Sequence, residues 1–280
     1  MSLKLGLLGA GIQSSRMPTL QKYLADLSGV SLTYELLDSA SNANFVLMQQ
    51  LQDVIGQGFH GINVTHPFKQ RVHPVVSQSL VPDQSQIGSY NTLLFKNNEI
   101  VGANTDHSGF IRGYKNRFSN SDPGTVLLCG AGGVGRAIAF SLVQLGVVKF
   151  YIFDIVASQA DSLCKTLETL GVSAIAIAEK DLLEVMVSVD GLSNCTALGM
   201  HKQPGSAFPE QAIGNQSWVF DAVYTPLETE FILRCKKAGL PCLTGFDLWL
   251  FQGVDAFNIF TGAHIDVDQA LIQTAFGWLD

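Results

Sequence analysis

Glycines at fixed spacing, followed by a distant aspartate, are the clearest chemical signal in the sequence. An apolar run at residues 126–129 leads into GAGGVG at 130–135, and a helical pattern follows. A second apolar run, residues 148–153, ends at Asp154. In a strand–turn–helix–strand unit, such glycines let the backbone turn tightly, approach a pyrophosphate and pack a helix against a strand. Free N–H groups at the helix N-terminus can then bind phosphates, so the segment predicts a dinucleotide site.

Asp154 also indicates which dinucleotide binds. It stands about 20 residues beyond the glycines, where an acidic side chain accepts hydrogen bonds from ribose hydroxyls. A 2′-phosphate would be repelled by this carboxylate, and NADP sites usually supply an arginine nearby. No basic residue occurs at 155–159, so we expect NAD rather than NADP. The alternative interpretation is a glycine-rich turn without a cofactor, in which the aspartate only forms a turn.

Polar clusters in the first part of the chain could supply the side chains for a reaction. Four of them lie at residues 14–18, 63–69, 88–92 and 102–106. Each stands where an apolar strand pattern meets a turn, and exposed functional side chains collect at such places. A substrate site built from these four clusters is therefore expected beside the dinucleotide.

Hydrophobic periodicity predicts the elements that must position these residues. In the first part, strands are expected at 3–8, 31–37, 61–65, 91–95 and 99–103, and helices at 18–27 and 42–57. Residues 105–118 are expected to form a linking helix. Further strands are expected at 126–129, 148–153, 173–177, 191–195, 218–222 and 241–243, with helices at 158–170, 181–187 and 229–238. The C-terminal region, 247–280, is expected to be wholly helical.

This order of elements predicts an α/β protein of two domains. The first, residues 1–104 plus 247–280, is an α/β substrate and catalytic domain with a mainly parallel sheet. The second, residues 105–246, is a Rossmann dinucleotide-binding domain. The C-terminal helices are too apolar to stand alone, so we expect them to pack back on the first domain. The cleft between two domains is the usual place for an active site.

Composition excludes several classes of function. The chain has 280 residues, 47% of them hydrophobic and only 15% charged, which suits a large core. Its net charge of −7, without a run of Lys or Arg, argues against nucleic acid as a partner. No apolar stretch of about 18 residues predicts a membrane span. The five cysteines contain no C-x-x-C pair and suggest reduced thiols in a cytoplasmic protein. The histidine spacing implies no metal site.

Seven motifs follow one another in a consistent order along nearly the whole chain. They are SSRMP (14–18), GINVTHPFKQRV (61–72), IGSYNTL (87–93), VGANTDHSGF (101–110), CGAGGVGRA (129–137), DAVYTPLET (221–229) and QGVDAFNIFTG (252–262). Together they resemble the shikimate dehydrogenase family, and most closely its NAD-using quinate/shikimate dehydrogenase branch. The resemblance implies NAD-dependent, reversible oxidation of shikimate and/or quinate to the 3-dehydro ketone. Such a reaction serves aromatic amino acid biosynthesis or quinate catabolism.

The resemblance also implies roles for individual residues. Lys69 and Asp106 match the catalytic pair that handles the hydroxyl proton, although Lys69 taken alone could be a surface lysine that starts a helix. A positioned lysine can exchange a proton with the alcohol oxygen, and Asp106 would orient it. The positions matching substrate-binding residues are Ser15, Thr65, Lys69, Asn91, Asp106, Tyr224 and Gln252. Those matching cofactor-binding residues are Gly130, Ala131, Gly132, Gly133, Val134, Gly135, Asp154, Ala222 and Gly245.

One position departs from the family pattern. The family has Ser-x-Ser or Ser-x-Thr before the proline, but Met17 replaces the second hydroxyl here. That hydroxyl would reach the substrate carboxylate, so a charge-assisted hydrogen bond of about 1.5–3 kcal/mol is missing. Either Ser14, Arg16 or Tyr90 compensates, or the substrate differs from shikimate at that end.

Two other functions stay open at this point. One is a shikimate-dehydrogenase-like oxidoreductase that acts on a different hydroxylated ring acid, as Met17 suggests. The other is a catalytically silent sensor of NAD or of a ligand, against which the intact Lys69 and Asp106 pair argues. The expected partner is a small shikimate- or quinate-like carboxylate, and the chain is expected to be a monomer or a homodimer. Sequence alone does not rank quinate against shikimate.

Overall fold

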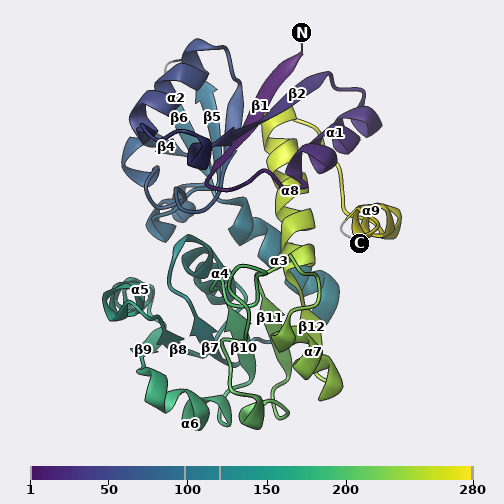
Figure 1. Cartoon of the computed structure of the whole chain (residues 1–280). Coiled ribbons are helices and arrows are strands. Elements are labelled where there is room, and N and C mark those ends of the chain that lie inside the picture. Colours follow the sequence, from purple (N-terminus) through teal and green to yellow (C-terminus); the bar gives the residue numbers. More distant parts are fainter. Residues whose placement is uncertain (1, 98, 120, 279–280) are drawn as a thin grey trace. The chain divides into compact units, whose positions relative to one another are not determined.

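The computed structural model describes residues 2–97, 99–119 and 121–278 (Figure 1). The chain divides into two compact units, which are treated separately below. The first consists of Met1–Thr105 and Leu250–Asp280, and the second of Asp106–Trp249. A six-stranded sheet with flanking helices forms each unit, which confirms the α/β class.

The sheet of the first unit is mixed but mainly parallel. Its strands are β1 (Leu3–Gly9), β2 (Leu32–Asp38), β3 (Gly61–Val64), β4 (Gln78–Ser79), β5 (Thr92–Lys96) and β6 (Glu99–Ala103). Their order is β2-β1-β3-β5-β6-β4. β1 pairs in parallel with β2 and β3, as β4 does with β6, while β5 runs antiparallel to β3 and β6. The predicted parallel character of this sheet is confirmed.

Helices from both ends of the sequence belong to the first unit. They are α1 (Met17–Ser28), α2 (Leu47–Gly56), the part of α8 (Gly245–Thr261) from Leu250 onward, and α9 (Gln269–Phe276). The side-chain amide of Gln21 in α1 donates to the carbonyl of Gly253 in α8 at 2.9 Å. The Tyr23 ring meets the Trp278 ring edge-on, with 5.1 Å between centroids. The C-terminal helices therefore pack back on the first domain, as predicted.

Two predicted helices are shorter than expected. Residues before Leu47 form a turn instead of a helix because the Asn42 side chain accepts the Asn44 N–H at 3.0 Å. The C-terminal region is not wholly helical, since α8 ends at Thr261 and Gly262 adopts φ +72°. Asn258 then caps the loop by bonding both the N–H and the carbonyl of Ile265. Polar side chains thus end helices that apolar periodicity would continue.

The sheet of the second unit is entirely parallel. Its strands are β7 (Thr125–Cys129), β8 (Lys149–Phe153), β9 (Ser173–Ala176), β10 (Gly191–Asn194), β11 (Trp218–Asp221) and β12 (Cys242–Leu243). They are arranged in the order β12-β11-β10-β7-β8-β9. The chain therefore leaves β7 in one direction, returns to β10 on its other side and continues outward. This reversal is the Rossmann arrangement, in which ligands bind outside the carboxyl ends of the two central strands.

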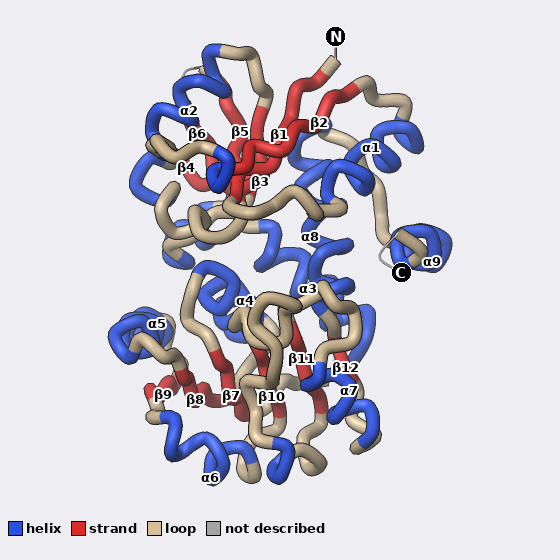
Figure 2. The backbone as a smooth tube through the Cα atoms, viewed as in Figure 1, coloured by secondary structure: helices blue, strands red, loops and turns tan. Residues whose placement is uncertain are grey.

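One helix leads into the first of these strands, and four others connect the strands (Figure 2). They are α3 (Thr105–Phe118), α4 (Gly133–Gln144), α5 (Ala157–Thr169), α6 (Leu182–Met186) and α7 (Glu230–Lys237). Short 3₁₀ turns occur in the two units at Ser39–Ser41, His73–Val75, Pro82–Ile87, Glu179–Asp181 and Glu210–Ala212. Within the described residues, no helix has the length and apolar character needed to cross a membrane.

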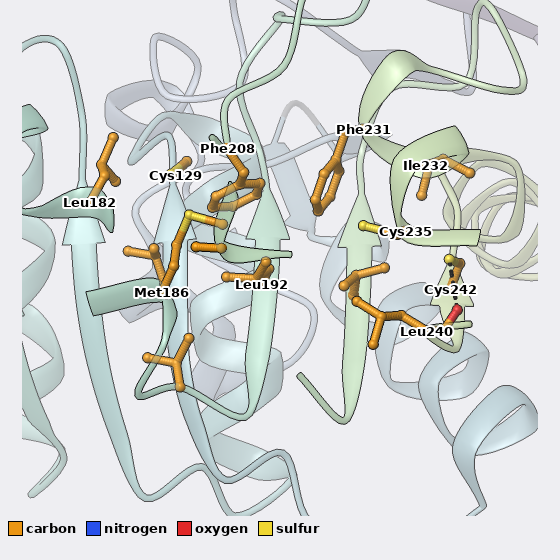
Figure 3. Packing of buried hydrophobic residues seen from close by; sticks show 14 residues of the cluster. Cys129, Leu182, Met186, Leu192, Phe208, Phe231, Ile232, Cys235, Leu240 and Cys242 are labelled. Atoms are coloured by element: carbon orange, nitrogen blue, oxygen red, sulfur yellow. Dashed lines mark hydrogen bonds between the residues drawn. The ribbon is translucent and has the colours of Figure 1, made fainter. Parts of the chain in front are cut away.

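An apolar cluster on the second sheet holds α6 and α7 in place (Figure 3). Leu192 of β10 is fully buried in it, together with Met186 of α6 and Phe231 of α7. The Phe208 ring packs on the Phe231 ring with 4.7 Å between centroids. Each such side chain contributes about 1.5–3 kcal/mol by leaving water. This core keeps the ends of β10 and β11 at fixed positions.

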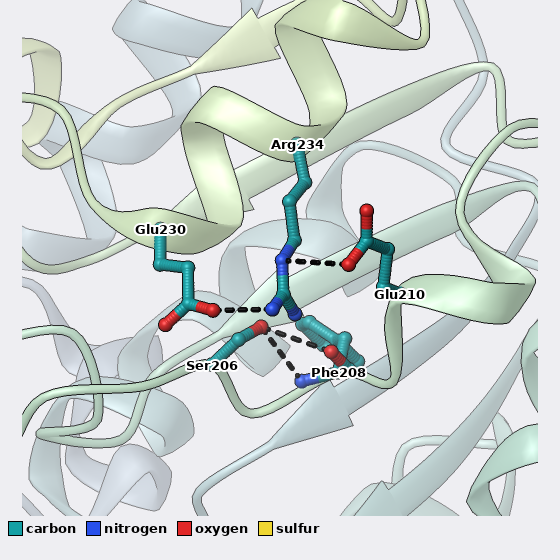
Figure 4. A network of polar contacts seen from close by, with 5 residues as sticks. All are labelled: Ser206, Phe208, Glu210, Glu230 and Arg234. Atoms are coloured by element: carbon teal, nitrogen blue, oxygen red, sulfur yellow. Dashed lines mark hydrogen bonds and ion pairs between the residues drawn. The ribbon is translucent and has the colours of Figure 1, made fainter.

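The long connection between β10 and β11 is anchored mainly by Phe208. Near it, the Ser206 hydroxyl donates to the Phe208 carbonyl and accepts the Phe208 N–H, at 3.0 and 3.1 Å (Figure 4). Arg234 of α7 forms ion pairs with Glu230 and with Glu210 of this connection. Both carboxylates are largely exposed, and exposed ion pairs contribute at most about 1 kcal/mol each. The buried ring therefore matters more than the charges.

Candidate functional site

The polar clusters of the first unit meet at one edge of its sheet. Leu8 of β1 pairs with Val64 of β3. Thr92 of β5 pairs with Asn63 of β3 on one side and with Ala103 of β6 on the other. Since β5 runs antiparallel, its first residue lies level with the last residues of β3 and β6. The segments that follow β1, β3 and β6 and the segment that precedes β5 therefore start from the same edge.

Asn91 is the centre of a buried hydrogen-bond network at this edge. Its side-chain amide donates to the Thr105 hydroxyl at 2.9 Å and to Gln252 Oε1 at 3.3 Å. Its side-chain oxygen accepts the Thr105 N–H at 2.7 Å. The Thr105 hydroxyl also donates to Gln252 Oε1 at 3.3 Å. Two predicted substrate-binding residues, Asn91 and Gln252, are thus brought together although they are 161 positions apart in the chain.

Residues of the expected polar clusters that were given no individual role complete the network. Asn63 donates to the Asn91 carbonyl at 3.3 Å and to the Thr92 hydroxyl at 3.2 Å, and it accepts the Tyr34 hydroxyl at 2.8 Å. Asn63, Thr92 and Thr105 all stand inside the quoted motifs, beside residues that were predicted. Their position next to a predicted residue at the end of a strand is the signal that could have identified them.

A second buried asparagine joins two of the clusters. Asn104 donates through its side chain to the Ser89 carbonyl at 2.9 Å, and its N–H donates to the Gln84 side chain at 2.9 Å. Asn104 and Ser89 are both fully buried. These bonds fix the turn before Asn91 against the turn before Thr105. The network around Asn91 is therefore stabilised by the bonds of Asn104 as well as by its own hydrogen bonds.

Lys69 and Thr65 belong to the same edge through their backbones. The Thr65 N–H donates to the Leu8 carbonyl at 2.8 Å, and the Tyr90 N–H donates to the Lys69 carbonyl at 2.9 Å. Lys69 therefore lies beside the turn that carries Asn91. Asp106 follows Thr105 directly in the first turn of α3 and is only 4% exposed. His66 and Lys69 lie in the segment that follows β3, and Tyr90 lies in the segment that precedes β5.

The Ser15–Met17 segment turns into α1. The Ser15 hydroxyl accepts the Met17 N–H at 3.3 Å, so it helps to start the helix. The Met17 side chain is 5% exposed, and its sulfur accepts a hydrogen bond from Gln21 at 3.5 Å. A Cβ placed on Gly253 would lie 3.4 Å from this sulfur. The methionine that departs from the family pattern therefore packs between α1 and α8.

Three glycines of the second unit have different surroundings. Gly130 adopts φ +94°, and a Cβ there would stand 2.8 Å from the Cys195 carbonyl. A Cβ on Gly135 would collide with the Gly130 carbonyl oxygen. A Cβ on Gly132, by contrast, would meet nothing within 4 Å. Two glycines thus permit tight backbone packing, while Gly132 leaves open space at the N-terminus of α4, where Gly133 and Val134 begin the helix.

Asp154 bridges the glycine turn and its own turn. Its carboxylate accepts the Ala131 N–H at 2.7 Å and the Val156 N–H at 2.8 Å. A carboxylate has about four acceptor positions, so capacity remains for further hydroxyl donors. The next side chain, Ile155, is 91% exposed and apolar. The turn-forming role and the ligand-binding role are therefore compatible in this aspartate.

Ala222 and Gly245 meet at the start of α8. A Cβ on Gly245 would stand 2.6 Å from the Ala222 carbonyl oxygen and 2.5 Å from that of Val223. Only glycine permits this approach of two backbones. Nearby, the Tyr224 ring stacks on the Trp249 ring at 6.3 Å between centroids. The predicted cofactor positions at the ends of β11 and β12 are thus adjacent.

Burial keeps several reactive groups of the second unit uncharged. It lowers the pKa of His107 to about 4, so this imidazole is neutral near pH 7. It raises the pKa of Cys195 to about 12, and that of Cys129 well above its ordinary value. All five cysteines are free thiols. A protonated, buried thiol is a poor nucleophile, so these cysteines are structural.

Known proteins are similar to this chain along nearly its whole length. The family described as the shikimate dehydrogenase substrate binding domain matches residues 7–93. Quinate/shikimate dehydrogenase (NAD(+)) of Corynebacterium glutamicum strain R is 35% identical, with 96% of each chain covered. Shikimate dehydrogenase (NADP(+)) of Streptomyces avermitilis is 33% identical, with 98% of this chain and 95% of that one covered.

Solved structures of related proteins have the same fold. Quinate dehydrogenase from Corynebacterium glutamicum, in complex with NAD, has a TM-score of 0.89 and 32% identity, with 99% of each chain covered. Shikimate 5-dehydrogenase from Thermus thermophilus, in complex with NADP(H) and shikimate, has a TM-score of 0.82 and 28% identity over 99% of each chain. The fold is therefore shared with these proteins along nearly the whole chain.

Proposed function

Because the chain belongs to the shikimate dehydrogenase family, we propose that it is an oxidoreductase that reversibly oxidises shikimate and/or quinate to the 3-dehydro ketone. The observation that carries the proposal is the buried Asn91–Thr105–Gln252 network at the edge of the first sheet. It offers converging amide and hydroxyl groups to a ligand rich in hydroxyls. A site of this kind rejects analogues that leave its polar groups unpaired.

The two units share the tasks of this proposal. The first unit, Met1–Thr105 with Leu250–Asp280, supplies most of the substrate-binding residues, and the second, Asp106–Trp249, binds the dinucleotide and also supplies Asp106 and Tyr224 to the substrate. The proposed substrate-binding residues are Ser15, Thr65, Lys69, Asn91, Asp106, Tyr224 and Gln252. The proposed cofactor-binding residues are the glycine turn 130–135 with Asp154, Ala222 and Gly245.

Lys69 and Asp106 handle the proton of the reacting hydroxyl. Oxidation of a secondary alcohol removes a hydride from carbon and a proton from oxygen. The bound nicotinamide supplies the hydride acceptor. Lys69 exchanges the hydroxyl proton, and general acid–base catalysis of this kind contributes about 10²- to 10⁴-fold to a rate. Asp106 accepts a hydrogen bond from a substrate hydroxyl and orients the lysine.

We further propose NAD as the preferred cofactor. Asp154 stands beside the glycine turn with acceptor capacity for ribose hydroxyls. The side chain that follows it is the exposed, apolar Ile155, which offers no positive charge to a 2′-phosphate. The compared relatives include proteins named for NAD(+) and for NADP(+), so the preference for NAD is proposed from the charge at this turn of the chain itself.

The test is an absorbance assay of reduced nicotinamide with shikimate and quinate, each with NAD and with NADP. Turnover of at least one acid with NAD, and much slower turnover with NADP, is expected. The double variant Asp154→Ser/Ile155→Arg should reverse the preference, because it replaces a repelling charge by an attracting one. Demonstrable NAD binding with no turnover of either acid would contradict the substrate assignment.

One observation favours a second candidate, an oxidoreductase for another hydroxylated ring acid. Met17 provides no hydroxyl at the position where the family pattern has one, and its side chain is buried against α8. A panel of hydroxylated ring carboxylates in the same assay separates the two candidates. A kcat/KM more than about tenfold above that of shikimate and quinate would identify the other acid as the substrate.

A further inference from the structure

Asp221 is a buried carboxylate at the last position of β11. It accepts the side-chain amide of Asn194 at 2.9 Å, the N–H of Val223 at 3.0 Å and the hydroxyl of Thr229 at 2.6 Å. All three donors are neutral, and Asp221 is 0% exposed. Burial accordingly raises the pKa of Asp221 to about 6. Burying a carboxylate among neutral donors costs folding free energy. The groups that bond to Asp221 therefore indicate its role.

One side of this carboxylate holds the loop after β11. Val223 donates its N–H to Asp221, and Ala222 donates its N–H to the Asn194 carbonyl at 2.8 Å. The carbonyls of Ala222 and Val223 lie against Gly245. The loop is therefore fixed between the carboxylate and the start of α8. It carries Ala222, a proposed cofactor-binding residue.

The other side of the carboxylate reaches the glycine turn. Asn194 donates to Asp221 and also to the Leu198 carbonyl at 3.0 Å, while its oxygen accepts the N–H and hydroxyl of Thr196. The Thr196 nitrogen lies 2.9 Å from the place where a Cβ of Gly130 would stand. The backbone that Asn194 holds is thus the backbone against which the glycine turn packs.

The orientation of the Asn194 amide is set by these partners. Its nitrogen faces a carboxylate and a carbonyl, and its oxygen faces an N–H and a hydroxyl. A rotated amide would direct its oxygen at the Asp221 carboxylate and its NH₂ at the Thr196 N–H. Asp221 therefore selects the one orientation in which Asn194 supports Thr196.

We infer that Asp221 is a positioning residue for the dinucleotide site. It fixes the Ala222–Val223 loop directly and, through Asn194, the Thr196 backbone beside Gly130. The Ala222–Val223 loop and the glycine turn therefore keep fixed positions relative to each other. The inference rests on the proposed function as a nicotinamide-dependent oxidoreductase. Asp221 touches neither substrate nor cofactor in this role. It acts by holding the loop that carries Ala222 and the Thr196 backbone against which the glycine turn packs.

The role requires converging acceptors and does not require charge. Asp221→Ala leaves three buried donors without an acceptor. Asp221→Asn keeps a carbonyl oxygen for Asn194 and Val223, while its NH₂ donates to Thr229, whose hydroxyl can act as an acceptor. The conservative variant should therefore rescue binding that the alanine variant loses.

Gln216 provides a matched control in the same unit. It is 4% exposed and donates to the carbonyls of Met186 and Ala212 at 2.8 and 3.0 Å. It precedes β11, whereas Asp221 ends that strand, so it lies at the opposite end of the sheet from the glycine turn. Gln216→Ala removes a comparable buried polar side chain without touching either cofactor loop.

The experiment measures the Kd of NADH by nicotinamide fluorescence, the KM for NAD+, kcat and the thermal unfolding temperature for each variant. Asp221→Ala should raise Kd and KM for the cofactor by at least about tenfold, since small misplacements are costly at such sites. Asp221→Asn should stay within about threefold of the unsubstituted protein. Gln216→Ala should lower the unfolding temperature and leave Kd unchanged.

Equal NADH affinities for Asp221→Ala and Gln216→Ala would overturn the inference. If Asp221→Ala does not fold, Asn194→Ala decides, and an unchanged Kd in that variant would also overturn it. An unsubstituted protein that binds NADH but turns over neither acid refutes only the substrate, and the Kd series still tests Asp221. A protein that binds no NADH refutes both the proposed function and the inference.

Discussion

At the edge of the first unit's sheet the candidate functional atoms belong to side chains, whereas at the carboxyl edge of the second unit's sheet most belong to the backbone. Asn91, Thr105 and Gln252 form the first site by hydrogen bonds between side chains. Gly130, Gly132 and Gly245 form the second by having no side chain. The comparison teaches that the proposed ring-acid substrate and the proposed dinucleotide would be recognised by different means.

The difference has an energetic basis. A side-chain network distinguishes ligands because each unpaired buried group costs about 1–3 kcal/mol. A backbone turn binds phosphate through N–H groups that every residue type carries, and so it needs only space and the correct conformation. Substitutions of the proposed substrate-binding side chains should therefore change the reaction or the substrate. Those in the glycine turn and at Gly245 should change cofactor affinity or stability.

The largest expected effect is a loss of kcat in Lys69→Met, and it tests whether catalysis and dinucleotide binding are separate. Lys69→Met removes the group proposed to exchange the hydroxyl proton, so kcat should fall by about 10²- to 10⁴-fold. The Kd of NADH should stay as it was, because the lysine belongs to the first unit. Steady-state kinetics and nicotinamide fluorescence measure the two quantities. A parallel loss of NADH affinity would break the comparison.

Two glycines of one turn should respond differently to a side chain. Gly132→Val fills open space, so we expect the Kd of NADH to rise about 100-fold, or about 2.7 kcal/mol, at an unchanged unfolding temperature. Gly135→Ala collides with the Gly130 carbonyl and should cost about 1–3 kcal/mol of stability. Thermal unfolding and NADH titration of both variants check this. If Gly132→Val and Gly135→Ala lose the same amount of stability, Gly132 is needed for packing and not for binding NADH.

A pH-dependent stability difference should belong to the second unit. The pKa of Asp221 is about 6 in the folded protein and about 3.9 in an unfolded chain, so the folded state binds more protons between these values. Its contribution to stability is therefore full below about pH 4 and is lost as pH rises through about 6. The nearby thiols of Cys195 and Cys235, each with a pKa of about 12, stay neutral throughout.

Asp221→Asn removes this titration. The difference in unfolding free energy between the unsubstituted protein and the variant therefore reports the titration of Asp221 alone. The unfolding free energy of the unsubstituted protein relative to the variant should fall by about 2 kcal/mol between pH 4.5 and pH 7. Urea unfolding at both pH values measures it. Titrations common to both proteins, such as that of His107, cancel in the difference. A constant difference would show that Asp221 is ionised in the folded state throughout.

The smallest expected effect concerns substrate choice in the first unit. Met17→Thr returns a hydroxyl to the position where the family pattern has one, and a charge-assisted hydrogen bond at the low end of its range, about 1.5 kcal/mol, corresponds to about a tenfold lower KM for shikimate. The unfolding temperature should fall, because the buried thioether also packs against α8. Kinetics with shikimate and quinate check the result. An unchanged KM would argue that the substrate carboxylate lies elsewhere.

Local patterns predicted the strands and turns well, because the signals for them lie within a few residues. The glycine turn and Asp154 could be identified from one segment of chain, and so could the strand ends that carry the polar clusters. The partners of Asn91 could not, since Gln252 lies 161 positions away and only the fold brings them together. Asn63 and Thr105 lie in the expected polar clusters, but only the fold shows that they bond to Asn91.

Helix ends were harder to predict than helix positions. Apolar periodicity continues through residues 42–46 and 262–268, where the structure has turns. Side-chain bonds from Asn42 and Asn258 to nearby backbone groups decide these ends, and single asparagines do not disturb a periodic pattern. Asp221 is a similar case, because its burial becomes visible only when β10, β11 and α7 are placed together.

The first unit is assembled from two separate stretches of chain, and this affects the order in which the protein can form on the ribosome. The bond between Gln21 and Gly253 closes a loop of 232 positions. The second unit, Asp106–Trp249, is continuous and is fully synthesised while α1 still lacks its partner helix. Domains generally fold as units during synthesis. The unit that begins the chain is therefore the one that finishes folding last.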